Sequence, residues 1–185
     1  MAASGTKKQK QTSKGGGKFL PALCGFLGTL ILTAVILSAL PLTIPRLLGY
    51  EIFTVVSGSM EPTLPMDSLV YVEPVDPAEI QTGEIVAFWR DGIVVTHRVA
   101  ENRREENSLI TRGDANDMED MDPVPYLNLI GRVKVHVPGL GLLMLYFVSA
   151  EGKIRLVCIA MAGALLNLIG SSLLRWQREK EREQT

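Results

Sequence analysis

Apolar residues form two long uncharged runs near the ends of the 185-residue chain. The first run covers residues 19–40, and the second covers residues 156–174, between Arg155 and Arg175. As a helix, the first run would be about 33 Å long, which matches the roughly 30 Å hydrocarbon core of a bilayer. A cleaved signal peptide is a weaker interpretation of this run, because its apolar core would be shorter and a small-x-small cleavage site would follow. The pattern therefore predicts two transmembrane helices.

Between these runs, short stretches rich in β-branched and aromatic residues alternate with turns that contain Pro and Gly, a pattern typical of strands. The dipeptide Asp91-Gly92 separates two of the stretches, and it favours a type I′ turn that would join them in a hairpin. No convincing amphipathic helix intervenes, so the middle of the chain is predicted to be mostly antiparallel β. The predicted strands are 52–56, 68–72, 84–90, 93–99, 108–111 and 129–137.

The apolar stretch 138–148 follows the last predicted strand and is too short to cross a bilayer. The sequence leaves two places for it. It can pack on the β-rich domain, or it can lie in the membrane interface.

Charge is distributed unevenly although the net charge is only -1. Residues 1–18 carry five Lys and no acid, whereas residues 46–153 carry nine basic and seventeen acidic side chains. Four basic residues also follow the second apolar run. The positive-inside rule then predicts that both termini are cytoplasmic and that the acidic middle lies outside. This balance argues against nucleic acid as a partner.

The predicted organisation therefore has five parts. A disordered basic tail and a second cytoplasmic tail enclose two spans and one extracytoplasmic β-rich domain. Cys24 and Cys158 both fall within the spans, so no disulfide and no cysteine metal site is expected. The boundaries are 1–18, 19–40, 46–153, 156–174 and 175–185.

Three polar segments of the middle region could carry chemistry together. Residues 57–64 read Ser-Gly-Ser-Met-Glu-Pro-Thr-Leu, His97 lies in a predicted strand, and residues 111–116 read Thr-Arg-Gly-Asp-Ala-Asn. A serine hydroxyl becomes a useful nucleophile when a histidine removes its proton and a carboxylate orients the imidazole. The same segments also suit ordinary turns, because Ser, Gly, Asp and Asn are all common turn residues.

These segments, with Thr-His-Arg-Val at 96–99 and Gly-Glu-Ile-Val-Ala-Phe at 83–88, resemble the type I signal peptidases of the endoplasmic-reticulum and archaeal branch. The resemblance covers about residues 45–140, extends to the preceding membrane anchor, and implies a signal-peptidase-like antiparallel β catalytic domain. With the two predicted transmembrane helices that flank this domain, the expected fold class is mostly β. It implies that Ser59 is the nucleophile and that His97 is the general base, where the bacterial housekeeping branch uses Lys. The Ser57 side chain and the Ser59 backbone N–H are the implied oxyanion donors. No cofactor or metal is implied.

The acidic motif of that family matches Asp114 and Asp120, and crowding by further acids leaves the orienting carboxylate open. A residue that orients an imidazole must be held rigidly. Asp114 directly follows Gly113 at the end of a predicted strand, whereas Asp120 lies six residues further along an acidic loop. We therefore expect Asp114 to be the orienting residue.

The resemblance also implies the substrates, which are exported precursor proteins that carry signal peptides, cut at the outer membrane face. Membrane lipid is the other implied partner, and partner subunits are not indicated. A second span is more similar to bacterial and archaeal members, which favours the plasma membrane with the catalytic domain outside. A lumen-facing protein of the endoplasmic reticulum membrane is the alternative.

Two other functions are compatible with parts of the sequence. Residues 114–122 contain five carboxylates, but they lack the Gly at the sixth position of an EF-hand calcium loop and fit that pattern poorly. A non-enzymatic membrane-anchored β-domain that binds a partner or assists assembly is the second alternative. Such a module would not need Ser59, His97 and Asp114 together.

Overall fold

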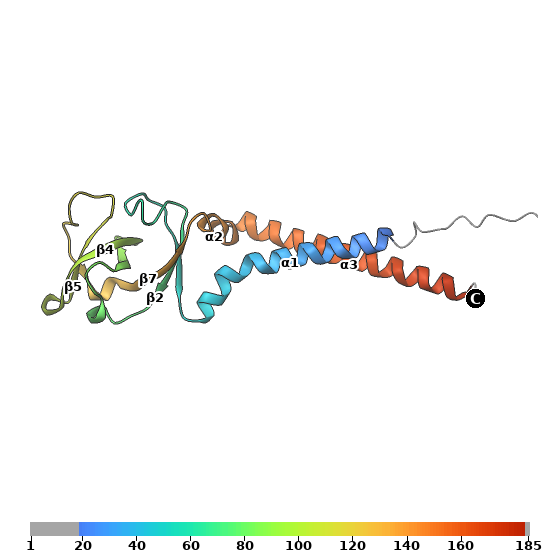
Figure 1. Ribbon diagram of the computed structural model, residues 1–185, viewed down its shortest axis with the longest axis horizontal. Helices are drawn as coiled ribbons and strands as arrows, with labels where there is room; N and C mark the ends of the chain where they lie inside the picture. Colours follow the sequence, from blue (N-terminus) through green and yellow to red (C-terminus); the bar gives the residue numbers. More distant parts are fainter. Residues whose placement is uncertain (1–18, 184–185) are drawn as a thin grey trace, which may run out of the picture. The chain divides into compact units, whose positions relative to one another are not determined.

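The computed structural model describes residues 19–183, which form an antiparallel β-sheet, two long helices and one short helix (Figure 1). The lysine-rich segment 1–18 lies outside the described residues. The helices are α1 (Phe19–Leu47), α2 (Gly141–Val148) and α3 (Ala150–Glu183). The strands are β1 (Glu51–Thr54), β2 (Leu69–Glu73), β3 (Ile85–Arg90), β4 (Ile93–Arg103), β5 (Ser108–Arg112), β6 (Val124–Pro125) and β7 (Leu129–Val137).

The sheet has the strand order β1-β2-β7-β3-β4-β5-β6, and every neighbouring pair is antiparallel. The predicted hairpin is confirmed, since β3 and β4 pair from Ile85↔Arg98 to Arg90↔Ile93. Asp91 and Gly92 both have positive φ, at 52° and 80°, as a type I′ turn requires. All six predicted strands are present, and β6 is an additional strand of two residues.

Buried side chains cover both faces of the central strands. Along β3, Val86 and Phe88 join one hydrophobic cluster and Ala87 joins another, as the period-2 alternation of a strand requires. The Ala87 cluster includes Met60 and Leu64, which come from the loop 57–64 rather than from a strand. Each fully buried side chain of this size contributes about 1.5–3 kcal/mol, so the loop is fixed by its own apolar residues.

The apolar stretch 138–148 contributes helix α2, which packs on β1 and β2. Met144 and Phe147 of this helix contact a small cluster of Leu42, Ile52 and Leu69. The structure thus supports the first of the two places open to this stretch. Leu142 and Leu145 of the same helix remain exposed.

Both long helices are apolar enough to cross a membrane. Residues 19–35 of α1 and the part of α3 from Leu156 onward form a compact unit of their own, and residues 36–155 form the other. Inside the first unit the two helices approach closely, because a Cβ on Gly28 would lie 2.6 Å from the Gly163 carbonyl oxygen. The Thr29 hydroxyl lies 3.2 Å from the Asn167 amide in the same seam. Small residues of this kind allow membrane helices to pack tightly.

The expectation of a mostly β protein needs correction. About 48% of the described residues are helical, because both terminal helices are longer than the apolar runs that revealed them. Helix α1 continues past residue 40 to Leu47, and α3 begins at Ala150 and extends to Glu183. The fold is therefore a seven-stranded antiparallel sheet together with two long apolar helices.

Candidate active site

Ser59 lies in the loop between β1 and β2, in a turn anchored by its neighbours in sequence. The Leu64 backbone N–H donates to the Met60 carbonyl at 2.8 Å, and that of Glu61 donates to the Gly58 carbonyl at 3.1 Å. The side chains of Met60 and Leu64 are fully buried. Because these residues point into the core, the turn holds Ser59 at the surface of the domain, where it is half-buried.

His97 lies on β4 opposite Val86 of β3 and is only 6% exposed. Its Nε2 atom lies 3.3 Å from the Ser59 Oγ atom. The ring of Phe88 meets the imidazole edge-on, with 6.2 Å between ring centroids. A serine hydroxyl and an imidazole that are 38 residues apart in sequence are thus brought within hydrogen-bonding distance.

Asp120 completes the arrangement on the other side of the imidazole. Its Oδ2 atom lies 2.7 Å from His97 Nδ1 and also accepts a 2.7 Å hydrogen bond from the Thr111 hydroxyl. The Asp120 backbone N–H donates to the Thr111 carbonyl at 2.8 Å, so the residue is tied to the end of β5. Burial raises the pKa of Asp120, but hydrogen bonds from Thr111 and His97 outweigh it, so the pKa is lowered overall. The carboxylate is therefore the charged partner that an imidazolium needs.

Asp114, which we expected to orient His97, does not contact the imidazole in the structure. Asp114 instead accepts two hydrogen bonds from Arg98, at 2.8 Å from Nε and 2.6 Å from Nη2. The Arg98 guanidinium lowers the pKa of Asp114, an effect that burial opposes and a hydrogen bond from Thr63 reinforces. The two candidate carboxylates thus have separate partners.

Strand alternation supplies the physical reason. His97 and Arg98 are consecutive on β4, so their side chains point to opposite faces of the strand. The segment after β5 contacts Arg98 through Asp114 and then contacts His97, six residues later, through Asp120. Asp120 lies in the acidic loop, but its backbone and its carboxylate are both hydrogen-bonded to Thr111, so the residue is held rigidly.

Residues 113–115 also hold the main chain of the serine turn. The Ala115 backbone N–H donates to the Ser59 carbonyl at 2.9 Å. A Cβ atom on Gly113 would lie 2.5 Å from that same carbonyl oxygen, so only glycine fits there without a shift. The Gly-Asp-Ala part of the motif therefore packs directly against Ser59.

Ser57, the predicted oxyanion donor, is exposed, and its Oγ atom lies 3.4 Å from Ser59 Oγ. An apolar groove of about 450 Å³ begins at Ser57 and passes between the β3–β4 hairpin and α2. Its lining includes Val56, Trp89, Ile93 and Met144. An extended apolar segment could lie along this groove and reach the serine turn.

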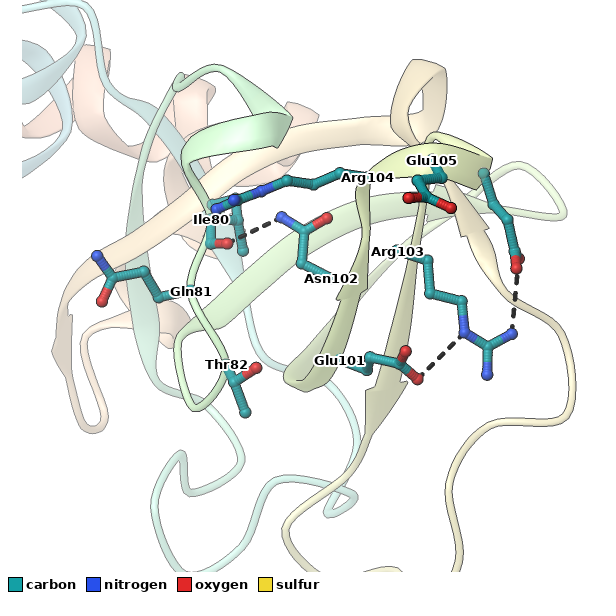
Figure 2. A pocket seen from close by; sticks show the side chains of 9 residues that line it. Ile80, Gln81, Thr82, Glu101, Asn102, Arg103, Arg104 and Glu105 are labelled. Atoms are coloured by element: carbon teal, nitrogen blue, oxygen red, sulfur yellow. Dashed lines mark hydrogen bonds and ion pairs between the residues drawn. The ribbon is translucent and has the colours of Figure 1, made fainter.

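A second cavity, of about 640 Å³, lies at the opposite end of β4 and includes none of the predicted site residues (Figure 2). There Asn102 donates to the Ile80 carbonyl, and Arg103 forms ion pairs with Glu101 and Glu106. Arg104, which also lines this cavity, donates to the Ala78 carbonyl.

The loop 114–122 does not gather its acids around one point. Asp114 binds Arg98 and Asp120 binds His97, and within residues 19–183 no cluster of three or more His, Cys, Asp or Glu side chains is arranged for a metal ion. The calcium-loop interpretation gains no support from this geometry.

A serine, a histidine and an aspartate hydrogen-bonded in series form the arrangement that serine hydrolases use for acyl transfer. Comparisons with known proteins agree with this class. The chain is 37% identical to signal peptidase I W of Bacillus subtilis over 84 residues, which is 43% of this chain and 44% of that protein. It is 27% identical to the signal peptidase complex catalytic subunit SEC11C of rat, and equally to that of human, over 129 residues, covering 63% of this chain and 67% of each relative.

No family model matches the chain. The alignment with the Bacillus protein spans less than half of that relative's length. The matches nevertheless show that this protein is a homologue of the signal peptidases, in the branch that contains the endoplasmic-reticulum subunit.

Three residues that contact the site were not singled out from the sequence. Thr111 and Arg90 both bind Asp120, and Arg98 binds Asp114. Arg98 directly follows His97 in sequence and could have been found as the cation nearest to the predicted base. Thr111 lies in the segment 111–116 but had no role assigned, and Arg90 carried no signal, because both roles depend on how the loop after β5 folds back.

We expect Asp114→Asn to lower the free energy of unfolding at neutral pH by about 1–3 kcal/mol, because Arg98 loses its charged partner. The folded-state pKa of Asp114 is lowered, so its contribution is present above the unfolded pKa of about 3.9 and is lost as pH falls through the folded value. The difference from wild type should thus disappear in acid. Thermal unfolding in detergent at several pH values measures this.

Asp117→Asn is the matched control, because Asp117 is exposed in the same loop. It should melt like wild type. An Asp114→Asn protein that melts like this control at neutral pH would contradict the assigned ion pair, as would a difference that persists in acid.

Proposed function

We propose that this protein is a membrane-bound serine endopeptidase that removes N-terminal signal peptides from exported precursor proteins. One observation carries the proposal. Ser59 Oγ, His97 and Asp120 lie in hydrogen-bonded series, at 3.3 and 2.7 Å, in a homologue of the signal peptidases. The catalytic residues proposed are Ser59 and His97, with Asp120 as the residue that orients the imidazole and Asp114 in a supporting position.

In the proposed reaction, His97 Nε2 takes the Ser59 hydroxyl proton as the oxygen attacks the scissile carbonyl carbon. The Asp120 carboxylate accepts a hydrogen bond from the His97 Nδ1–H group. This hydrogen bond fixes the tautomer of the imidazole and stabilises the imidazolium. The imidazolium then protonates the departing amine, and the C–N bond breaks to leave an acyl-enzyme. Water, deprotonated by His97, hydrolyses that ester and returns the proton to Ser59.

The negative charge that develops on the carbonyl oxygen needs hydrogen-bond donors. We assign the Ser59 backbone N–H and the Ser57 hydroxyl to this role, and the 3.4 Å separation of the two serine oxygens supports it. One donor of this kind is typically worth about 3–4 kcal/mol in the transition state.

The groove that begins at Ser57 suits the proposed substrate class. Its lining is mostly apolar and includes Val94, Val95 and Thr96 of β4 and Ser57, two residues before Ser59, so we place the peptide beside β4 with its scissile bond near Ser59. Small side chains before the cleavage site would fit a shallow apolar surface better than charged ones would.

The orientation of the protein in the membrane is also a proposal. Two helices can span a membrane, and basic residues gather before the first and after the second. We infer that both termini are cytoplasmic and that the domain between the spans is extracytoplasmic. Ser59 follows the end of α1 by about a dozen residues, which would keep the site near the outer membrane face. The second span favours the plasma membrane of a bacterium or archaeon.

A non-enzymatic membrane-anchored domain remains the alternative function. A module that only binds a partner would gain nothing from burying a hydrogen-bonded histidine and aspartate beside an accessible serine, because buried polar groups are costly to maintain. The site geometry favours the peptidase.

The main test is cleavage of a panel of signal-peptide-bearing precursors by the purified protein in liposomes. Ser59→Ala should abolish cleavage with an unchanged melting temperature, because it removes only one oxygen from the turn. Ser57→Ala should retain weak activity, since one oxyanion donor remains. Cleavage by Ser59→Ala at the wild-type rate would refute the peptidase proposal.

The two histidines of the chain form a matched pair for the same assay. His97→Ala should lose about 10²–10⁴ in rate, the usual cost of removing a general base. His136 lies exposed on β7, so His136→Ala should cleave like wild type.

Orientation is tested by single cysteines in a background that lacks Cys24 and Cys158. A cysteine at Asn107, in the turn between β4 and β5, should react with an impermeant thiol reagent in intact cells. Cysteines at Ser4 and Gln184 should be protected. Labelling at either terminus with protection at Asn107 would reverse the assigned topology.

A further inference from the structure

Arg90 is the last residue of β3, and its side chain reaches Asp120, the proposed orienting carboxylate. Its Nη1 atom donates to Asp120 Oδ2 at 3.2 Å, and its Nη2 atom donates to the Asp122 carbonyl at 3.0 Å. The guanidinium carbon lies 5.0 Å from the centroid of the Phe88 ring, which itself packs edge-on against His97. One side chain thus contacts the acidic loop at two points and an aromatic neighbour of the base at a third.

We propose that Arg90 is a positioning residue for the Asp120–His97 pair, which ties the acidic loop to β3 and shares the carboxylate oxygen that binds the imidazole. The proposal rests on the peptidase function and deepens it. Arg90 does not contact the reacting atoms, and it acts only through Asp120.

The first part of this role is mechanical. The loop after β5 returns to the sheet at Asp120, where its backbone is held by Thr111. Arg90 adds a second tie, two residues further along, at the Asp122 carbonyl. The β3–β4 turn fixes the end of β3, so the guanidinium provides a rigid support for the carboxylate.

The second part is electrostatic. Asp120 Oδ2 receives hydrogen bonds from His97, Thr111 and Arg90 together. A fixed cation at this oxygen offsets part of the carboxylate charge and opposes the formation of a second cation on the imidazole. Arg90 therefore acts on the imidazole only through the carboxylate oxygen that both side chains share.

The other charged groups near Asp120 and His97 have partners or positions of their own. Arg98 is engaged by Asp114, and the charge of Arg112 also acts on Asp114. Glu61, in the serine turn, lies near Gly58. Asp122 meets Arg90 through its backbone carbonyl, and the variants below leave all of these groups unchanged.

The test measures kcat/KM for precursor cleavage against pH for the full-length protein in liposomes. Arg90→Met should lower the plateau rate about tenfold, because the loop loses its tie, and should move the acid limb to higher pH by about 0.5–1 unit. Arg90→Lys keeps the charge but cannot bridge both acceptors. It should lower the plateau with the acid limb unchanged.

Arg103→Met is the matched control. Arg103 lies on β4 and forms ion pairs with Glu101 and Glu106, both of which are exposed. This variant should match wild type in both rate and pH profile. An acid limb in Arg90→Met that stays in place or moves to lower pH would overturn the proposal, because freeing Asp120 from His97 would have that effect. Equal shifts in the Met and Lys variants would overturn it too.

Failure of the peptidase proposal gives a different result. In that case Ser59→Ala and wild type would behave alike in the same assay. If Ser59→Ala is inactive and wild type cleaves, the Arg90 profiles test the positioning role alone. The melting temperature of each variant separates loss of fold from loss of positioning, and Arg90→Lys remains informative if Arg90→Met does not fold.

Discussion

The site depends on the 2.7 Å hydrogen bond between His97 Nδ1 and Asp120 Oδ2, which is formed where both side chains are less than a tenth exposed. Charge interactions are strong in such a place, and an unpaired ion would be costly. The bond leaves Nε2 directed at Ser59. Everything else around the pair, including the Thr111 hydroxyl and the Arg90 guanidinium, contributes to holding the carboxylate where the imidazole needs it.

Strand β4 links the base to the main chain of the nucleophile. His97 contacts Ser59 directly, while Arg98, the next residue, holds Asp114 and with it the segment that binds the Ser59 carbonyl. Two consecutive residues of β4 therefore contact the Ser59 side chain and the segment that binds the Ser59 main chain. The two aspartates of the acidic loop thus have separate partners on one strand, Asp120 at His97 and Asp114 at Arg98.

The sequence was sufficient for features with local causes. The hairpin followed from Asp91-Gly92, the strands followed from their β-branched runs, and the helices followed from apolar length. Features that depend on contacts between segments brought together by a loop were not predictable in this way. Strand β6 has only two residues, and the tie between Asp120 and Thr111, which holds the acidic loop in place, joins two segments separated by a turn. Alternation along β4 could have shown that one carboxylate cannot serve both His97 and Arg98.

The central claim is that Asp120, rather than Asp114, orients the catalytic imidazole, and precursor cleavage by the two Asp→Asn variants tests it most directly. Asparagine preserves the side-chain shape but favours the wrong imidazole tautomer, and in serine proteases with a Ser-His-Asp triad this change costs about 10⁴ in turnover. The account predicts a loss of that order for Asp120→Asn with little change in melting temperature, and a much smaller loss for Asp114→Asn with reduced stability. A nearly inactive Asp114→Asn beside an active Asp120→Asn would contradict it.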